Sequence, residues 1–343
     1  IRTISRLTLL LLMIFAGSSC GDYSTGSGYH GPPDTSRQNG LWVVSGTEPA
    51  LMRLSAEQLA ASGSVTPSTL ITTTSAPFTL NSVAFDVDGT MWMSNPGDSS
   101  LLAFAPSALS SSGEHTATRV ISTTDGSLNA PSALAFDASH HLWVANHGNG
   151  PIVRFDSAQL ASSGAPVPTI VLSGTGHPTG LAFDADGSLW FSDNQANRLA
   201  KYAAAQLNAS GFILPAVVLN TNGTTLRNPS GIAFDDAGKL WVANLSNQTV
   251  IALGVGQLDT TGLANPSIVI SPTTTSPALP VALAFDDAGN LWVVDGVGAL
   301  AKYDHTALAA SGAPAPAVRI VLPNHLNLWM PAFWPQPSRL PLH

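Results

Sequence analysis

The sequence predicts an all-β fold, because one short pattern recurs six times along the chain. Each copy reads Leu-Trp-Val or a close variant, followed by small or polar residues, and the six tryptophans are Trp42, Trp92, Trp143, Trp190, Trp241 and Trp292. The copies are about 50 residues apart, and each unit holds four short runs that read as strands. A repeat of this length is typical of β-propellers. We therefore expect a six-bladed β-propeller of four-stranded antiparallel blades over residues 39–334.

The unit around Trp190 illustrates how each blade is built. We expect strands at 180–183, 189–192, 198–202 and 216–219, from the innermost to the outermost. An Asp/Gly turn separates the first two runs, and these residues tolerate the positive φ that a tight hairpin demands. Each of the six units should therefore form one antiparallel sheet.

The connection between the third and fourth runs also repeats. It carries a leucine, preceded by glutamine in four units, and a glycine follows four residues after each leucine, as in Gln206, Leu207 and Gly211. This spacing predicts one helical turn closed by a left-handed glycine cap. The leucine is expected to cover the edge of the blade, a structural role because it recurs in every unit.

The two ends of the chain are expected to complete one blade together. The first unit begins at Leu41-Trp42-Val43 and lacks an innermost strand, whereas Ala332-Phe333 falls in register 48 residues after Ala284-Phe285. The C-terminal strand should therefore close the ring and leave no open sheet edge. The proline-rich tail, residues 335–343, is expected to be an extended coil on the surface.

The recurring tryptophans and aspartates have both structural and functional interpretations. The tryptophans could form an aromatic cage, but a Trp at one fixed place in every blade is better explained as filling the wedge between blades. The aspartates cluster in the hairpin turns, as in Asp86-Val87-Asp88-Gly89. We interpret them as turn-forming residues rather than calcium loops.

Composition and charge limit the partners. Hydrophobic residues make up 44% of the chain and charged residues 10%, with a net charge of -8. This balance suits a large core, and its acidic sign argues against binding nucleic acid or anionic lipid surfaces. We expect a monomer that contacts a membrane only through an N-terminal lipid.

The N-terminus reads as an export signal over residues 1–20. Arg2 and Arg6 precede an apolar run at 7–15, and Ala16-Gly17-Ser18-Ser19 leads to Cys20, the single cysteine. This segment resembles a bacterial lipoprotein signal, which implies lipid attachment at Cys20; plain signal-peptidase cleavage is the alternative. Residues 21–38 are polar and rich in Gly and Ser, as in a flexible tether. The expected location is the bacterial cell envelope, either lipid-anchored or periplasmic or extracellular.

A ring of oxygen-bearing side chains is expected at one face, where the second strands end. Its members are Ser45, Asn95, Asn146, Asp193, Asn244 and Asp295, with His147 and His177 in loops of the same face. Such a ring could bind a protein, peptide or glycan, or Ca²⁺ or Mg²⁺ through Asp193 and Asp295. The alternative is that each side chain caps its own loop by bonding nearby backbone N–H groups.

The chain resembles the NHL-repeat propellers and the SMP-30/gluconolactonase-like and streptogramin-lyase-like families over residues 40–334. The likeness is clearest at 178–193, which reads PTGLAFDADGSLWFSD. The lactonases imply metal-binding Asn and Asp at four inner-strand positions, which here are Ser132, Thr179, Ser230 and Val281. The lyases imply paired His and a Glu around Mg²⁺; here only His147 and His177 approach one face. We therefore expect a non-catalytic binding or scaffold module, with a metal-dependent lactonase or lyase as the alternative.

Overall fold

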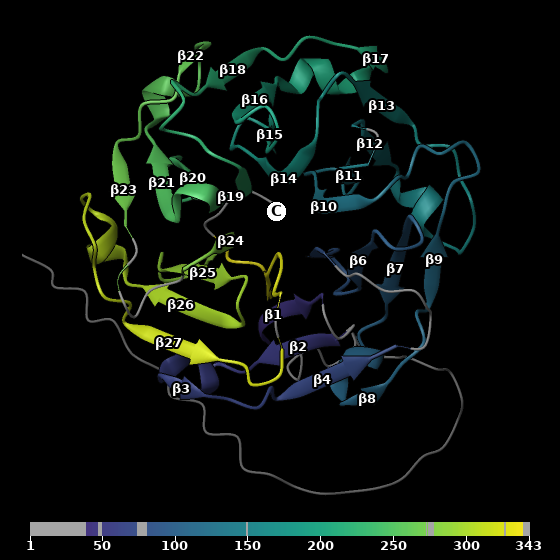
Figure 1. Cartoon of the computed structure of the whole chain (residues 1–343). Helices are drawn as coiled ribbons and strands as arrows, with labels where there is room; N and C mark the ends of the chain where they lie inside the picture. Colours follow the sequence, from purple (N-terminus) through teal and green to yellow (C-terminus); the bar gives the residue numbers. More distant parts are fainter. Residues whose placement is uncertain are drawn as a thin grey trace, which may run out of the picture. The chain divides into compact units, whose positions relative to one another are not determined.

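The computed structural model describes residues 39–46, 50–73, 81–148, 150–271, 273, 278–325 and 327–338. The predictions for the export signal, Cys20, the tether and residues 339–343 lie outside these ranges. The described residues form six mainly antiparallel sheets arranged around one axis (Figure 1). The predicted six-bladed β-propeller is therefore confirmed. In the part of the chain described, no helix is both long and apolar enough to cross a membrane.

Each blade contains four main strands, which are named below in order from the innermost, at the axis, to the outermost. Blade I consists of β28 (Ala332–Trp334), β1 (Gly40–Ser45), β2 (Ala50–Leu54) and β4 (Thr69–Thr72). Blade II consists of β5 (Val83–Phe85), β6 (Met91–Asn95), β7 (Ser100–Phe104) and β9 (Arg119–Ile121). Blade III consists of β10 (Pro131–Phe136), β11 (Leu142–Asn146), β12 (Ile152–Phe155) and β13 (Ile170–Ser173).

The other three blades follow the same order. Blade IV consists of β14 (Pro178–Phe183), β15 (Leu189–Asp193), β16 (Arg198–Tyr202) and β18 (Val217–Asn220). Blade V consists of β19 (Pro229–Phe234), β20 (Leu240–Asn244), β21 (Thr249–Leu253) and β23 (Ile268–Ile270). Blade VI consists of β24 (Pro280–Phe285), β25 (Leu291–Asp295), β26 (Ala299–Tyr303) and β27 (Val318–Val321).

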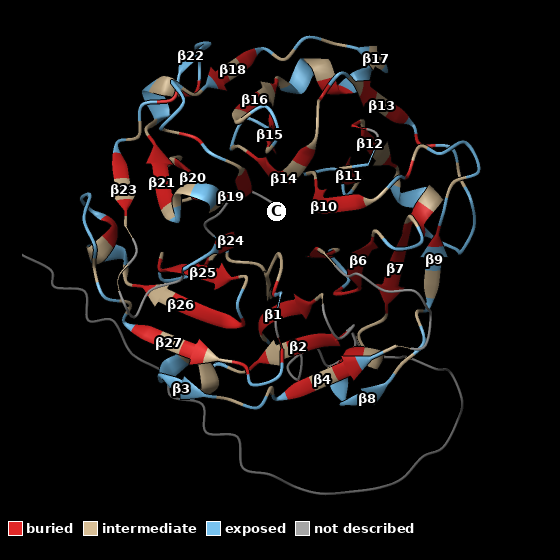
Figure 2. Ribbon diagram, in the orientation of Figure 1, coloured by how far each residue is buried: buried red, intermediate tan, exposed pale blue. Residues whose placement is uncertain are grey.

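The six repeated tryptophans fill the spaces between neighbouring blades, as predicted. All six are at most 1% exposed. Trp143 of blade III meets Phe183 of blade IV edge-on at 6.3 Å between ring centroids, and Trp241 meets Phe285 of the next blade at 5.9 Å. Figure 2 shows the consequence, with the inner and middle strands buried and exposure increasing toward the rim. The hydrophobic core is thus a set of wedges between blades rather than a single central cluster.

The ring closes as the sequence predicts. Strand β28 pairs antiparallel with β1, with Phe333 opposite Leu41 and Ala332 opposite Trp42. The same register occurs in the other blades, as in blade V, where Phe234 faces Leu240 and Ala233 faces Trp241. The C-terminal strand therefore occupies the innermost position that the first unit lacks.

The connection between third and fourth strands differs from the prediction. A short 3₁₀ turn is present in every blade, at η2 (Gln58–Ala60), η3 (Ala108–Ser110), η4 (Ser157–Leu160), η5 (Ala204–Asn208), η7 (Val255–Gln257) and η8 (His305–Leu308), and another, η6 (Leu245–Asn247), follows β20. The expected left-handed glycine cap is wrong. The glycine instead starts a short strand, as in β3 (Gly63–Ser64), β8 (Gly113–Glu114), β17 (Gly211–Phe212) and β22 (Gly262–Leu263).

These short strands join neighbouring blades at the rim. Each pairs in parallel with the outermost strand of the preceding blade, as β17 does with β13 and β3 with β27 (Figure 1). Single bridges from Gly164 to Ile121 and from Gly312 to Ile270 do the same at the remaining interfaces. The chain is extended after the 3₁₀ turn because it pairs with the outer edge of the preceding blade.

The start of the C-terminal tail reaches the axis. Gln336 donates from Nε2 to the carbonyl of Phe85 (3.4 Å), and the N–H of Ser338 donates to Oδ1 of Asp287 (2.9 Å). Gln336 and Pro337 also line a central cavity. The predicted surface coil is therefore only half-exposed at Gln336 and Pro337. Gln336 and Ser338 attach the tail to blades II and VI.

Candidate functional site

The second strands of all six blades end at one face of the propeller, which we call the mouth face. The residues at these ends are the predicted ring, and each is at most 1% exposed: Ser45, Asn95, Asn146, Asp193, Asn244 and Asp295. The hairpin turns with their aspartates lie at the opposite end of the same strands, which we call the hairpin face. The ring is therefore positioned as expected, but its side chains are buried.

Asn146 and Asn244 hold equivalent loops in two blades. Oδ1 of Asn146 accepts from the backbone N–H of Asn129 (2.9 Å), and its Nδ2 donates to the carbonyl oxygens of Ser127 (2.9 Å) and Pro151 (3.1 Å). Asn244 bonds the corresponding N–H of Arg227 (2.7 Å) and carbonyl of Thr225 (2.9 Å). Both amides thus tie the segment that precedes the innermost strand to the end of the second strand.

The two aspartates of the ring are also bonded within their own blades. Asp193 accepts from the N–H of Ala196 (3.1 Å) and from Nε of Arg198 (3.0 Å). Asp295 accepts from the N–H groups of Ala278 (2.9 Å) and Leu279 (3.2 Å). These are the hydrogen bonds of the loop-capping interpretation, since they consume the oxygens that a ligand would need.

The remaining two ring positions differ from this pattern. Ser45 forms a backbone bridge with Leu328. The amide of Asn95 is fully buried and has no hydrogen-bond partner among the residues that the structure describes. Neither Ser45 nor Asn95 lines the cavity that opens at the mouth face and is described below.

The two ring carboxylates that could hold a metal are engaged in hydrogen bonds within their own blades. Asp193 and Asp295 belong to different blades, β15 and β25, and both carboxylates are already hydrogen-bonded. Across the described ranges, no three His, Cys, Asp or Glu side chains come together as metal ligands. A Ca²⁺ or Mg²⁺ site needs several oxygen ligands around one point, and these two carboxylates do not provide it.

The structure brings the two predicted histidines together. Their ring centroids are 5.3 Å apart, and Nδ1 of His177 lies 3.0 Å from the carbonyl oxygen of His147. Because a carbonyl only accepts, Nδ1 of His177 is the donor, which leaves Nε2 as the acceptor in the neutral ring. His147 lines a cavity at the mouth face.

This cavity, which we call the mouth pocket, has a volume of about 340 Å³. Three amides, three hydroxyls and one imidazole supply its polar wall, and three larger side chains supply its apolar wall. The lining residues are Asn81, Asn194, Asn228, Ser132, Thr179, Ser230, His147, Leu245, Trp329 and Met330. None of these described lining residues is a carboxylate, lysine or arginine, so together they form a polar wall without a fixed charge.

The hydroxyls of the wall also hold neighbouring blades together. Oγ of Ser132 donates to the carbonyl of Pro178 in the next blade (2.8 Å), and Oγ1 of Thr179 donates to that of Pro229 (3.2 Å). Ser132, Thr179 and Ser230 are positions at which the lactonase resemblance implies metal ligands. Here two of them are inter-blade contacts that make the wall of the pocket rigid.

A second, apolar cavity of about 70 Å³ lies where the innermost strands converge. Every blade contributes to it, through Val83, Leu134, Leu181, Ile232, Leu283 and Phe333. Met330 lines both cavities, whereas Gln336 and Pro337 line only the apolar one. The mouth pocket is therefore backed by apolar side chains and by the beginning of the C-terminal tail.

Sequence reasoning missed the apolar wall of the mouth pocket. Trp329 and Met330 belong to the irregular segment before β28, and Leu245 follows β20 as His147 follows β11, so the residue types at these positions do not recur from blade to blade. A tryptophan outside the six-fold pattern was the one available signal for this wall.

Comparison with known proteins finds likeness in structure alone. No protein-family model matches the sequence, and no curated protein matches it. A streptogramin B lyase structure is 17% identical, with 68% of each chain covered and a TM-score of 0.48. A nidogen–laminin complex matches at 13% identity, covering 85% of this chain and 96% of that one, with a TM-score of 0.59. A Bacteroides caccae protein of unknown function matches at 10% identity, covering 83% and 98%, with a TM-score of 0.56.

Sequence identities this low, with matching structures, show the fold and do not indicate an activity. The likeness to the lyase has a TM-score of 0.48 and supports no statement about catalysis. The six sheets around one axis, together with the likeness to the nidogen–laminin and Bacteroides chains, identify this protein as a six-bladed β-propeller, the fold that its resemblance to NHL-repeat propellers implies.

Proposed function

We propose that the protein is a binding module that holds a polar partner in the mouth pocket without transforming it. The observation that carries this proposal is the contrast between the pocket and the ring. The pocket offers uncharged donors and acceptors in a volume of about 340 Å³, whereas the ring carboxylates Asp193 and Asp295 are bonded to their own blades. A cavity of this size with a few convergent polar groups is typical of a small-ligand site.

The proposal is tested by retention of ligand on the immobilised protein. Ser230→Leu places an apolar side chain in the pocket and keeps the backbone carbonyl of Ser230, which accepts from Oγ of Ser192 (2.6 Å). We expect envelope components to be retained by the wild type and lost by this variant. Asp186→Ala, on the exposed hairpin turn, is the matched control and should retain them. Equal retention by all three proteins would contradict the proposal.

A second candidate function is a lactonase-like or lyase-like enzyme that uses His147 and His177. The observation in its favour is the 5.3 Å separation of the two rings at the mouth face, with Nδ1 of His177 donating to the carbonyl of His147, so that Nε2 is the acceptor of the neutral ring. An imidazole in that state is able to take a proton from a bound substrate. Turnover of a lactone panel, measured with and without Mg²⁺ or Ca²⁺, decides between the candidates. Turnover that disappears in both His147→Gln and His177→Gln would replace the binding proposal.

We also propose export to the bacterial cell envelope, with a lipid on Cys20. The supporting observation is the order of Arg2 and Arg6, the apolar run 7–15 and the single cysteine. Mass spectrometry of the mature N-terminus is expected to show a diacylglyceryl-modified Cys20. An unmodified N-terminus at another residue would overturn lipid attachment and leave cleavage by a plain signal peptidase.

A further inference from the structure

The lining of the mouth pocket restricts the charge of its ligand. Among the residues that the structure describes, its polar groups are amides, hydroxyls and one imidazole, with no carboxylate, lysine or arginine. A charged ligand placed there would lose hydration without gaining an ionic partner, which is unfavourable. An uncharged ligand rich in hydroxyls matches the lining better, because each hydroxyl both donates and accepts as the amides do.

One amide of the pocket has an unused acceptor. Oδ1 of Asn194 is shielded from solvent and accepts no hydrogen bond from any described residue. A shielded acceptor without a donor costs free energy, and rotation of the Asn194 side chain toward the adjoining cavity would let a hydroxyl of a ligand supply that donor. Asn194 lines the pocket together with Asn228, whose backbone N–H is held by Oδ1 of Asn197 (2.6 Å).

The opposite wall offers an aromatic surface. Trp329 is half-buried, and its backbone N–H donates to the carbonyl of Val44 (3.1 Å). Its indole lies so close to Gly46 that a Cβ there would be 2.9 Å from Nε1. The side chain is therefore held in place beside the pocket. An indole face favours flat apolar C–H surfaces, and a sugar ring carries such a face with hydroxyls at its edge.

The shape of the cavity favours a compact ligand. Met330 stands between the mouth pocket and the apolar cavity of about 70 Å³, beyond which lie Gln336 and Pro337. A ligand therefore enters from the mouth face and ends inside the pocket, which suits one terminal unit of a chain better than an extended peptide.

From these contacts we infer that the mouth pocket binds an uncharged sugar, as the terminal unit of a neutral glycan. The sugar ring packs on Trp329, and its hydroxyls bond Asn194 and the neighbouring amides. The inference rests on the proposed binding function and names the class of its ligand.

Isothermal titration with a panel of neutral mono- and disaccharides tests the inference. We expect at least one neutral sugar to bind, and its uronic acid counterpart to bind about 10-fold or more weakly. Trp329→Ala should weaken binding about 10-fold or more, and Asn194→Ala about 5-fold. Asn208→Ala, an exposed asparagine of the hairpin face, is the control and should bind as the wild type does. Because Trp329→Ala could unfold, Trp329→Phe is measured beside it and should show an intermediate affinity in a folded protein.

A second measurement covers sugars that the panel lacks. Envelope extract is treated with periodate, which cleaves the vicinal diols of glycans, before it is passed over the immobilised wild type. Loss of pocket-dependent retention supports the sugar. Retention that survives periodate and still disappears in Ser230→Leu would overturn the sugar while leaving the binding function intact. Absence of any retention that depends on the pocket, with no binding in the panel, would overturn both.

Discussion

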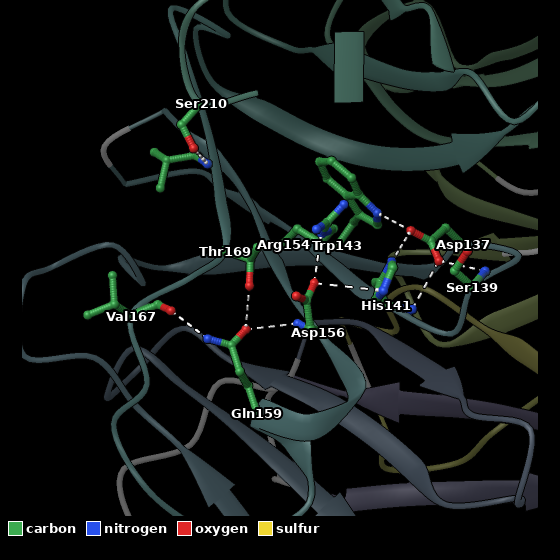
Figure 3. Close-up of polar contacts among 11 residues, drawn as sticks. Asp137, Ser139, His141, Trp143, Arg154, Asp156, Gln159, Val167, Thr169 and Ser210 are labelled. Atoms are coloured by element: carbon green, nitrogen blue, oxygen red, sulfur yellow. Dashed lines mark hydrogen bonds and ion pairs between the residues drawn. The ribbon is translucent and has the colours of Figure 1, made fainter. Parts of the chain in front are cut away.

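The most repeated residue-scale contact joins a turn aspartate to a buried tryptophan. In blades II to VI, Oδ2 of the aspartate accepts from Nε1 of the tryptophan six residues later, at distances of 2.8 to 3.3 Å. The other oxygen of Asp137, for example, accepts the N–H groups of Ser139 and His141, as Figure 3 shows. One carboxylate therefore shapes the turn and satisfies the indole. This explains why aspartate recurs there, in agreement with its interpretation as a turn residue.

Replacing Asp235 tests this contact. Asp235→Ala removes hydrogen bonds from Ala237, Lys239 and Nε1 of Trp241, and leaves a buried indole N–H without a partner. We expect the free energy of unfolding to fall by about 2 to 4 kcal/mol. The neighbouring Asp236 is exposed, so Asp236→Ala removes the same charge and should change stability by about 0.5 kcal/mol or less. Denaturant unfolding compares the two variants, and equal losses would refute the role given to Asp235.

Tyr202 gives the fold a dependence on alkaline pH. Burial raises the pKa of Tyr202 to about 12, and its hydroxyl has no hydrogen-bond partner within the described ranges. In the unfolded chain a tyrosine ionises near pH 10. Since the folded state keeps the proton longer, the stabilising contribution is complete below about pH 10 and is lost as pH rises toward 12.

Tyr202→Phe should abolish this contribution to the pH profile. At pH 7 the variant is expected to equal the wild type or exceed it by up to about 1 kcal/mol, because it lacks an unsatisfied buried hydroxyl. Between about pH 10 and 12 the wild type should lose stability relative to the variant. Denaturant unfolding at a series of pH values measures the difference, and a difference independent of pH would contradict the assignment.

At the scale of elements, the connection between third and fourth strands acts as a clasp between blades. Inside the connection, Gln159 accepts from the N–H of Asp156 (2.8 Å) and donates to the carbonyl of Val167 (2.6 Å), as seen in Figure 3. Toward the preceding blade, a serine or threonine before the glycine accepts an N–H from the outermost strand. Ser210 does so from Val171 (3.0 Å) and Ser62 from Arg319 (3.0 Å). The glutamine therefore stabilises the connection itself, and the hydroxyl attaches the connection to the preceding blade.

Gln159→Ala tests the internal part of the clasp. The change removes three hydrogen bonds, including one from Oγ1 of Thr169 (3.0 Å), in a half-exposed setting. We expect a loss of about 1 to 2 kcal/mol in unfolding free energy. Ser157→Ala, on the exposed side of the same 3₁₀ turn, is the control and should cost about 0.5 kcal/mol or less. Thermal unfolding of both variants provides the comparison, and an unchanged Gln159→Ala protein would refute it.

At the scale of the whole molecule, the ring is closed twice between the first and last blades. Strand β28 supplies the innermost strand of blade I, and β3 of blade I pairs with β27 of blade VI at the rim. Phe333 also meets Trp292 of blade VI at 6.5 Å, so it fills the last inter-blade wedge. Closure thus depends on both sheet pairing and side-chain packing.

Ending the chain at residue 330 should destabilise the entire ring. The deletion removes β28 and exposes the inner face of β1 together with the wedge at Trp292. Large buried aromatic contacts are worth about 3 to 5 kcal/mol each, which corresponds to a fall of about 10 °C or more in Tm. Deleting residues 339–343 alone leaves these pairs in place and should leave Tm unchanged. A Tm that stays constant after both deletions would refute closure by β28.

The sequence by itself determined the blades and their closure. The contacts that define a blade join residues close in the chain, such as Asp235 with Trp241, so a short pattern encodes them. The closing strand was predictable too, because Phe333 keeps the spacing of the repeat. The ring of oxygen-bearing residues was placed on the correct face, but whether Asn146 bonds a ligand or its own loop depends on a backbone N–H 17 residues earlier.

Only the tertiary structure decided the site. The mouth pocket combines Asn81 of blade II, Asn194 of blade IV and Trp329 of the closing segment, which are far apart in the chain. They meet because six innermost strands converge on one axis. A local sequence pattern does not encode which residues of different blades face each other across that axis. The rim clasps have the same origin, since Ser210 and Val171 belong to different blades. Short-range hydrogen bonding leaves a periodic trace in a sequence, whereas contacts between blades arise only once the ring is closed.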